Sequence, residues 1–461
     1  MRHTPLKFSG LFIFLFSIVG LLFAKCGLAQ DIAGVWECYV NARQKHSEIL
    51  PDTNRTDSAS DASDLPAKRV WPGLSEIHFY LSLEKQDDQW KAFFLNGDEK
   101  IEVPTVEVDG NKVRLRVDHY DSELSLKLVP PSDAVARHLS GTWKKRRGKN
   151  KWVEMNFSGT QSNNRSKQGK LTTSFDGTWK VKFEKSEDPA VGVFKMDPKT
   201  KRIDGTFLTT TGDYRYLSGY VHGVIGKTFE DFAAERVWPE TMTLSCFDGA
   251  HAFEFRARID GKGGLEGDFW SSDSWHETWT AQRDPNAKLP DDFKQTKLVK
   301  GETLQSLVFP DLQGNPTSVG DKKFAAPVRL VHVFGSWCPN CHDAAVYLSE
   351  LKKKYGEKVS VVGLAFELTG DHKRDSAQVK KYLDRYELDH PVLIAGLSDK
   401  KLASKAIPLL DRVRSYPTTI FADADGKVIA VHTGFTGPAT GKAYTDLKSK
   451  FETTIESILK D

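Results

Sequence analysis

Cysteine is scarce in this chain, and neither sign of charge prevails. The 461 residues include 5 cysteines, and the formal net charge is +3. A balance this close to neutral does not indicate a nucleic-acid-binding protein, so we expect no nucleic-acid partner. The P-loop, the dinucleotide-binding fingerprint and the His-Glu-x-x-His motif are absent from the sequence. We therefore expect no cofactor and no metal centre.

Long apolar runs are also missing, except at the start of the chain. Residues 11–24 are almost wholly apolar, follow Arg2 and Lys7, and lead into small residues up to Ala29. This order is typical of a secretory signal peptide, which we predict over residues 1–29. The run is shorter than the ~20 residues of a membrane-spanning helix. We expect an exported protein of the periplasm or cell envelope; an uncleaved segment would instead anchor it to the membrane.

Removal of the signal peptide would leave four cysteines: Cys38, Cys246, Cys338 and Cys341. Disulfides persist in oxidising compartments, so Cys38 and Cys246 are candidates for a structural bridge. Two separate buried thiols are the alternative interpretation.

The region from residue 31 to residue 283 has the pattern of an all-β domain. Short segments of alternating or β-rich character recur at residues 77–83, 90–95, 112–117, 124–128, 179–183 and 253–259. Asp-Gly pairs, which favour tight turns, punctuate them. Short strands joined by such turns predict a β-barrel or β-sandwich.

A recurring Gly-x-aromatic unit supports the barrel, with Trp36, Trp143 and Trp179 among its aromatic residues. The unit is weakly similar to strand openings in lipocalin- and avidin-like barrels. A barrel of about eight strands can enclose one small ligand, or its interior can be filled by side chains. The sequence identifies no small-molecule ligand for this domain.

Residues 284–303 lose the β alternation and gain Pro, Asp and Lys, which indicates a linker. A chain of this length is expected to hold more than one core. We therefore predict a second domain over residues 304–461.

The most specific signal of the chain is the loop Trp337-Cys338-Pro339-Asn340-Cys341. It lies between a strand-like segment, residues 328–334, and a segment with apolar residues near helical spacing, residues 343–355. The positive end of a helix stabilises a thiolate, so we predict that Cys338 is a nucleophile and that Cys341 closes a redox-active disulfide with it.

A static disulfide or half of a zinc site are the alternatives for this pair. Zinc would need two further Cys or His ligands at finger-like spacing, and His342 is the only other candidate close by in sequence. The strand–turn–helix context favours the redox interpretation.

With this motif, residues 304–461 resemble the TlpA/ResA-like thiol:disulfide oxidoreductases of the thioredoxin fold. The resemblance implies an enzyme that acts on protein dithiols and disulfides, more often a reductase recharged by a membrane electron donor than an oxidase. It also implies that Pro417 follows a cis peptide bond, that the backbone of Tyr416 pairs with the substrate chain, and that Trp337 offers an apolar docking face.

Thioredoxins usually keep a buried acid on the strand that leads into the motif, and this chain has His332 at that position. Glu367 ends the segment 359–366, which is predicted to be a parallel strand beside residues 328–334. We interpret Glu367, alone or with His332, as the proton acceptor that deprotonates Cys341. Burial would raise the pKa of this carboxyl towards the working range.

Two other functions remain open. A redoxin-type peroxidase shares the fold but would need Thr-x-x-Cys, whereas Gly335 lies three residues before Cys338. Alternatively, the all-β domain binds a ligand or an envelope partner, and the redox domain is an accessory.

Overall fold

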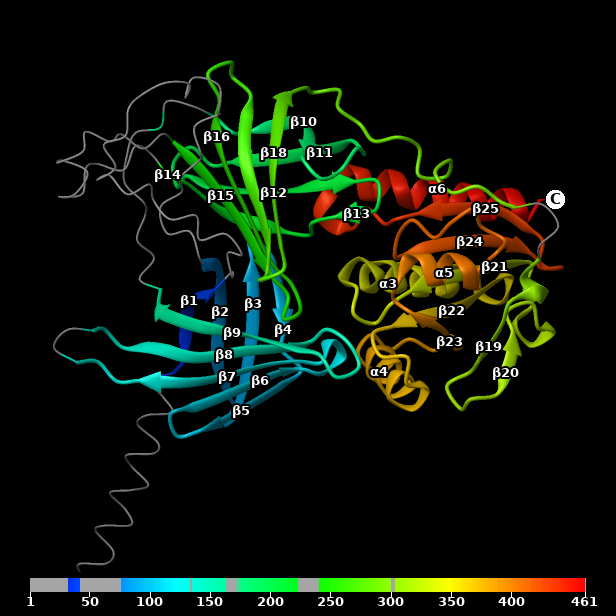
Figure 1. The fold of residues 1–461 in the computed structure, drawn as a ribbon, viewed down its shortest axis with the longest axis horizontal. Coiled ribbons are helices and arrows are strands. Elements are labelled where there is room, and N and C mark those ends of the chain that lie inside the picture. Colours follow the sequence, from blue (N-terminus) through cyan, green and yellow to red (C-terminus); the bar gives the residue numbers. More distant parts are fainter. Residues whose placement is uncertain are drawn as a thin grey trace, which may run out of the picture.

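The computed structural model describes residues 32–41, 76–132, 135–162, 171, 174–222, 240–299 and 303–460 (Figure 1). The predicted signal peptide lies outside the described residues. Two nine-stranded β-sheets precede a five-stranded mixed sheet that is flanked by helices. We refer to residues 32–283 as the β region and to residues 303–460 as the redox region.

The first sheet is antiparallel throughout and has the strand order β4-β3-β2-β1-β9-β8-β7-β6-β5. Its strands are β1 Gly34–Asn41, β2 Glu76–Gln86, β3 Gln89–Asn96, β4 Glu99–Glu102, β5 Thr105–Asp109, β6 Lys112–Val117, β7 Ser122–Val129, β8 His138–Arg146 and β9 Trp152–Gln161. The predicted β segments of this part of the chain all fall within these strands.

The second sheet is a closed barrel, because β11 pairs with both β10 and β12. Its strands are β10 Gly177–Phe183, β11 Ala190–Met196, β12 Arg202–Thr209, β13 Gly212–Asp213, β14 Leu217–His222, β15 Thr241–Phe247, β16 Ala252–Ile259, β17 Leu265–Ser271 and β18 Trp275–Arg283. The prediction of an all-β region, as a barrel or a sandwich, is confirmed, and this sheet takes the form of a barrel. Aromatic rings stack in its core, Phe255 lying 4.2 Å from Phe207 and 4.4 Å from Phe269 between ring centroids, so side chains fill this interior.

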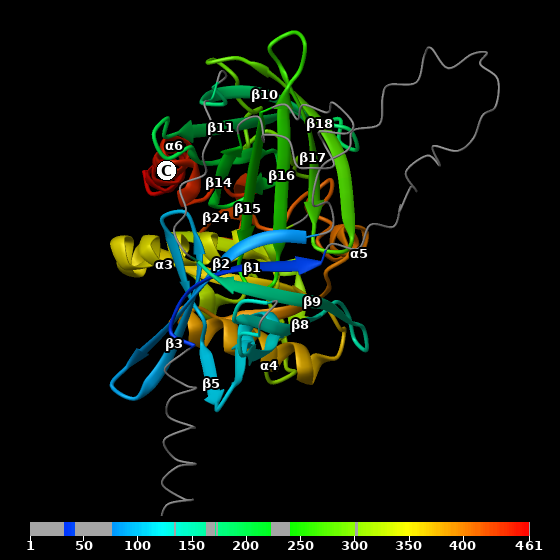
Figure 2. The same ribbon diagram turned by 90° about the vertical axis from the view of Figure 1, so that its left-hand side faces the viewer.

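The first sheet is curved but does not close on itself (Figure 2). Its apolar core is completed by Phe247 and Trp270, which belong to the second sheet. The ring of Phe79 stacks on Phe247 with centroids 4.0 Å apart. The two sheets therefore share one packed interface, across which apolar area is removed from water.

The redox region contains a central mixed sheet with the order β23-β22-β21-β24-β25. Its strands are β21 Val328–Phe334, β22 Val359–Glu367, β23 Val392–Leu397, β24 Thr418–Asp423 and β25 Val428–Thr433, and a small hairpin of β19 Val308–Pro310 and β20 Pro316–Ser318 precedes them. Strands β21, β22 and β23 are parallel. The predicted strands at residues 328–334 and 359–366 are confirmed.

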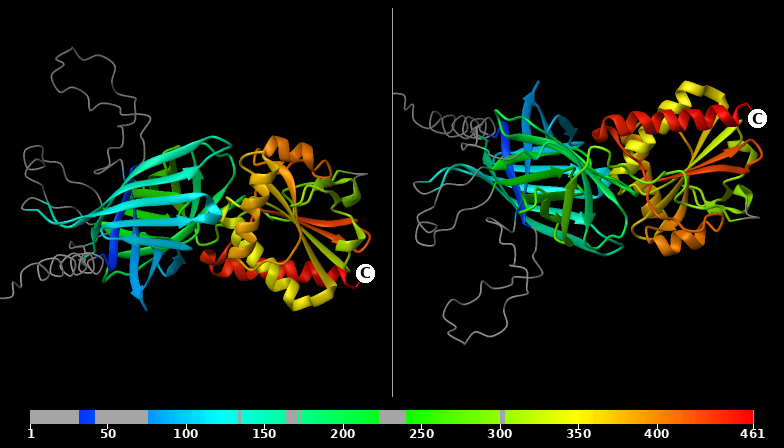
Figure 3. Two further views of the ribbon diagram at one scale, coloured as in Figure 1. Left: turned by 90° about the horizontal axis from the view of Figure 1, so that it is seen from below. Right: turned by 90° about the horizontal axis from the view of Figure 1, so that it is seen from above.

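Helices cover both faces of this sheet (Figure 3). They are α3 Pro339–Tyr355, α4 His372–Arg385, α5 Lys400–Ala406 and α6 Lys442–Ile458. Apolar side chains of α3 and α6 share one core cluster, whereas those of α4 and α5 pack on the other face. Among the described residues, no helix is long and apolar enough to cross a membrane.

Cys38 and Cys246 are both free thiols in this structure. Each is buried, Cys38 in the core of the first sheet and Cys246 in that of the barrel. The bridge considered from the sequence is therefore not formed, and the alternative of two separate buried thiols holds.

Candidate active site

Cys338 is the N-cap residue of α3, and Pro339 occupies the first turn of that helix. Proline is suited to this position because its missing N–H would have no intrahelical partner there. Opposite the cysteine, the Tyr416–Pro417 peptide bond is cis, as predicted. The Cys338 thiol donates to the carbonyl oxygen of Tyr416 at 3.5 Å. Cys338 is therefore held between the start of a helix and the cis-proline loop.

Cys341 lies one turn into α3 and is fully buried. Burial raises the pKa of its thiol well above the ordinary value, and the hydrogen bond with Cys338 and the charge of Cys338 act in the same direction. Cys341 is therefore a protonated thiol, which needs a proton acceptor before it can attack a mixed disulfide.

Glu367 ends β22 behind the cysteine loop and is buried. Its carboxylate oxygens accept hydrogen bonds from the backbone N–H of Ser336 at 2.8 Å and from the Ser336 hydroxyl at 2.7 Å. Burial raises the pKa of Glu367 to about 7, although the bonds from Ser336 oppose this shift. Its partner is thus Ser336, which the sequence argument did not consider.

His332 lies in β21 with its ring stacked on Phe334, centroids 5.0 Å apart. Burial, assisted by the charge of His390, lowers the pKa of His332 to about 3. The imidazole is therefore neutral at physiological pH, and it does not titrate in the range where Glu367 does.

Trp337 lies in the loop between β21 and α3 and packs against Tyr416 of the cis-proline loop. Its indole N–H donates to the carbonyl oxygen of Phe366 at 2.9 Å, and its ring meets that of Tyr416 edge to face. A Cβ atom at Gly335 would lie 2.2 Å from the indole nitrogen, so glycine is required there for this packing.

A second polar chain, missed from the sequence, joins the cysteine helix to the β region. His342 Nε2 faces the carbonyl oxygen of Ser336 at 2.8 Å and must carry the proton. Its Nδ1 therefore accepts from the hydroxyls of Tyr386 at 2.8 Å and Tyr120 at 3.1 Å. Tyr120 belongs to the short helix Asp118–Tyr120 of the first sheet. Tyr120 and His342 are 222 positions apart in sequence, so only the folded structure reveals this contact.

The β region also reaches the two residues between the cysteines. Arg215 donates to the Pro339 carbonyl oxygen at 3.2 Å and pairs with Asp343 of α3 at 2.5 Å. Asn340 donates from its side-chain amide to the carbonyl oxygen of Asp213 at 3.1 Å. The barrel thus contacts the active-site loop directly.

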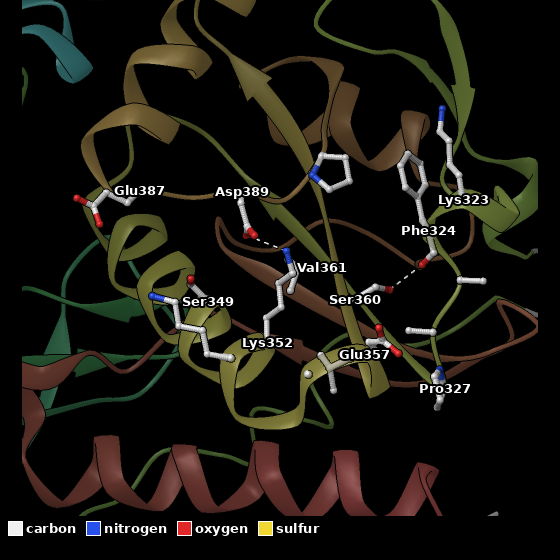
Figure 4. Close-up of a pocket in the computed structure, with 16 residues that line it drawn as sticks. Lys323, Phe324, Pro327, Ser349, Lys352, Glu357, Ser360, Val361, Glu387 and Asp389 are labelled. Atoms are coloured by element: carbon white, nitrogen blue, oxygen red, sulfur yellow. Dashed lines mark hydrogen bonds and ion pairs between the residues drawn. The ribbon is translucent and has the colours of Figure 1, made fainter.

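A surface cavity of about 1040 Å³ lies elsewhere in the redox region. It is lined by the second half of α3 and the first residues of β22, and Figure 4 shows Lys352 paired with Asp389 on its wall. The cysteines follow the opposite end of the central strands, so this cavity is separate from the thiol pair.

A Cys-x-x-Cys pair at the start of the helix that follows a central parallel strand, with a cis-proline opposite, defines a thioredoxin-class site. The family described as Redoxin matches residues 299–447. A thioredoxin-like protein, YneN of Bacillus subtilis, is 30% identical over 141 residues, covering 31% of this chain and 75% of that protein. The chain therefore belongs to the thioredoxin-like thiol-disulfide oxidoreductases.

Two further similarities are of comparable extent. The thiol-disulfide oxidoreductase ResA of Halalkalibacterium halodurans is 25% identical over 137 residues, which are 29% of this chain and 68% of that protein. A thiol:disulfide interchange protein of the thioredoxin family from Chlorobium tepidum has a solved structure, which is 22% identical and covers 33% of this chain and 98% of its own, with a TM-score of 0.24.

Proposed function

We propose that this protein is an exported thiol:disulfide oxidoreductase that reduces protein disulfides through Cys338 and Cys341. The observation that carries the proposal is the position of Cys338, an N-cap residue with the second thiol one turn further along and the carbonyl of Tyr416 beside it. A substrate sulfur that met Cys338 there would also lie close to its resolving partner.

The reaction follows from these positions. The Cys338 thiolate attacks one sulfur of the substrate disulfide, the substrate S–S bond breaks, and the departing thiolate takes up a proton. Cys341 then loses its proton, attacks the mixed disulfide and releases the second substrate thiol. The substrate gains two electrons, and Cys338 and Cys341 become a disulfide.

We assign Glu367 as the acceptor of the Cys341 proton, because the charge of its carboxylate acts on the Cys341 thiol and Ser336 holds that carboxylate through its hydroxyl. The raised pKa of about 7 supports this role, because an acceptor works best when its pKa lies near the working pH. Trp337, Tyr416 and Pro417 form the surface on which we expect the substrate chain to bind.

A reductase must be recharged after each turnover. We propose a membrane electron donor of the thiol-reductase type, which fits an exported protein with the predicted signal peptide over residues 1–29. The domain division that we propose is residues 31–283, 284–303 and 304–461. Part of the intervening segment is docked, since Phe293 packs against Phe421 of β24.

The decisive experiment is the reduction potential of the Cys338–Cys341 pair, measured on the full mature chain in defined thiol buffers. Dithiol sites of this class span roughly −270 to −120 mV. We expect a value near the reducing end of this range. A value near the oxidising end would make the protein a disulfide donor and would contradict the proposed direction.

A peroxidase is a second candidate, because the matching family is Redoxin. Gly335 argues against it, since that position lacks the threonine hydroxyl expected three residues before a peroxidatic cysteine. Peroxide consumption by the reduced protein, compared with its reduction of a disulfide, separates the two functions.

A further inference from the structure

Residues 210–215, which we call the capping turn, follow β12 and include β13 of the barrel. Within it, the carbonyl oxygen of Thr211 accepts a hydrogen bond from the hydroxyl of Ser415 at 2.7 Å. Ser415 directly precedes Tyr416, whose carbonyl oxygen contacts the Cys338 thiol. The capping turn therefore lies against the cis-proline loop beside the nucleophile.

The same turn is fitted closely to the active-site loop. A Cβ atom at Gly212, whose φ is +145°, would lie 2.1 Å from the side-chain nitrogen of Asn340. Asp213 accepts a hydrogen bond from the backbone N–H of Gly437 through its carboxylate. Three separate segments of the redox region thus contact a turn of six residues.

Arg215 holds the capping turn through ion pairs with two acidic residues. Its guanidinium pairs with Asp343 of α3 and, at 2.8 Å, with Glu99 of the first sheet. The side chains of Arg215, Glu99 and Asp343 are only 13%, 14% and 19% exposed. Removing one partner of a mostly buried ion pair leaves an uncompensated charge, so Arg215→Ala is expected to loosen the capping turn.

The nucleophile of the site is nearly buried. Cys338 is 6% exposed, and disulfide exchange requires an incoming sulfur to approach its thiolate in line with the bond that breaks. Trp337 remains only partly buried and packs on residues of its own region. The partly exposed residue beside the nucleophile is therefore Trp337.

We propose that the capping turn determines the substrate class of this site. It admits disulfides on small molecules or on short unfolded segments and excludes those of folded proteins. This inference rests on the proposed exchange at Cys338. It deepens that function, because it assigns specificity to residues of the β region, far in sequence from the cysteines.

Access can be measured separately from catalysis. In the full chain with Cys341→Ala, Cys338 would be labelled with N-ethylmaleimide and with a maleimide carried on a long polyethylene glycol. We expect the small reagent to react much faster. Arg215→Ala should raise the rate with the large reagent by about 10-fold or more and raise the rate with the small one much less.

Arg202→Ala is the matched control, because Arg202 pairs with Asp98 and Asp204 within the β region. It should leave the size dependence unchanged. Gly212→Ala gives an independent way to displace the turn, with Gly110→Ala as its control, since that glycine also has positive φ but open space around its Cβ position. Thermal melting verifies that each variant is folded.

Equal labelling rates for the two reagents in the protein with the turn intact would overturn the proposal. So would an unchanged size dependence in both folded Arg215→Ala and folded Gly212→Ala. If labelling follows expectation but the enzyme with both cysteines exchanges no disulfide of any size, the capping turn is upheld and the proposed function is wrong.

Discussion

The two cysteines of the β region and the two of the redox region are all buried, yet their surroundings differ. Cys38 and Cys246 lie within strands β1 and β15 with apolar neighbours, and burial raises the pKa of both thiols. Cys338 is 6% exposed and Cys246 is 4% exposed. Exposure therefore does not distinguish the two pairs.

The difference lies in the backbone around each thiol. Cys338 begins a helix, where unpaired N–H groups stabilise an anion, and its partner Cys341 is one turn away. Thiols within strands have neither feature, because the ladder already uses the neighbouring N–H groups. Reactivity should thus belong to the redox pair alone, which substitutions can test.

The largest expected effect is that of Cys338→Ser. We expect disulfide reduction to fall by about 1,000-fold or more, because the hydroxyl is a far weaker nucleophile than the thiolate. The double substitution of Cys38 and Cys246 to alanine is the control and should keep activity within about 2-fold. Substantial loss in the control would show that the β-region thiols take part.

Cys341→Ala sharpens the comparison by dividing the roles within the redox pair. Cys338 can still attack, but the mixed disulfide cannot be resolved, so a covalent complex with substrate should accumulate. Mass spectrometry under non-reducing conditions would detect it. Accumulation with Cys338→Ala instead would reverse the two roles.

Glu367→Gln should slow resolution of the mixed disulfide by about 100-fold, because the amide cannot accept the Cys341 proton. The unaltered protein should resolve faster as the pH rises through about 7, where Glu367 loses its proton, and the variant should lack this inflection. Stopped-flow measurement across pH gives both results.

His332→Phe is the matched comparison for this prediction. The pKa of His332 is lowered to about 3, so its removal should leave the inflection unchanged. An inflection that disappears with His332→Phe but persists with Glu367→Gln would assign the proton transfer to the histidine.

Glu367 should also make stability depend on pH. Its pKa is about 7 in the folded protein and about 4.3 in the unfolded chain, so the folded state binds more protons between these values. The free energy of unfolding should therefore fall by about 3 kcal/mol as the pH rises from about 4 to about 7 and beyond. Chemical denaturation of Glu367→Gln, compared with the unaltered protein, should lack this component.

The smallest effect is expected for Cys246→Ala alone. Removing a buried sulfur from the barrel core should destabilise the fold by about 1 kcal/mol and leave the reduction potential unchanged. Urea denaturation and thiol-buffer equilibration measure the two quantities. A shifted potential would connect the barrel thiol to the redox pair.

Much of the redox region was predictable, because its signals are local. The apolar strand at residues 328–334 and the loop that follows it were identified correctly from short segments, and the cis bond before Pro417 was implied correctly by the family resemblance. Glu367 was expected near the cysteines, but its hydrogen-bond partner Ser336 was not identified. Glu367 ends β22, and Ser336 follows the end of β21. The sequence does not indicate which hydrogen-bond donors will face a carboxylate at such a strand end.

The β region was predictable in class but not in arrangement. Alternation identified its strands, and Gly-x-aromatic units marked where buried tryptophans enter the core, as at Trp36 and Trp179. The second sheet closes on itself, whereas the core of the first sheet is completed by Phe247 of the second. Both features depend on contacts between distant strands. No local pattern encodes that choice.

The sequence by itself determined the chemistry of this protein, because the two thiols, the helix start between them and the strand before them are contiguous. Which substrate molecules can reach Cys338 depends on the tertiary structure. Arg215 and Pro339 are 124 positions apart, and the capping turn has no pattern of its own. Its contact with the active-site loop arises from how the barrel and the redox region pack together.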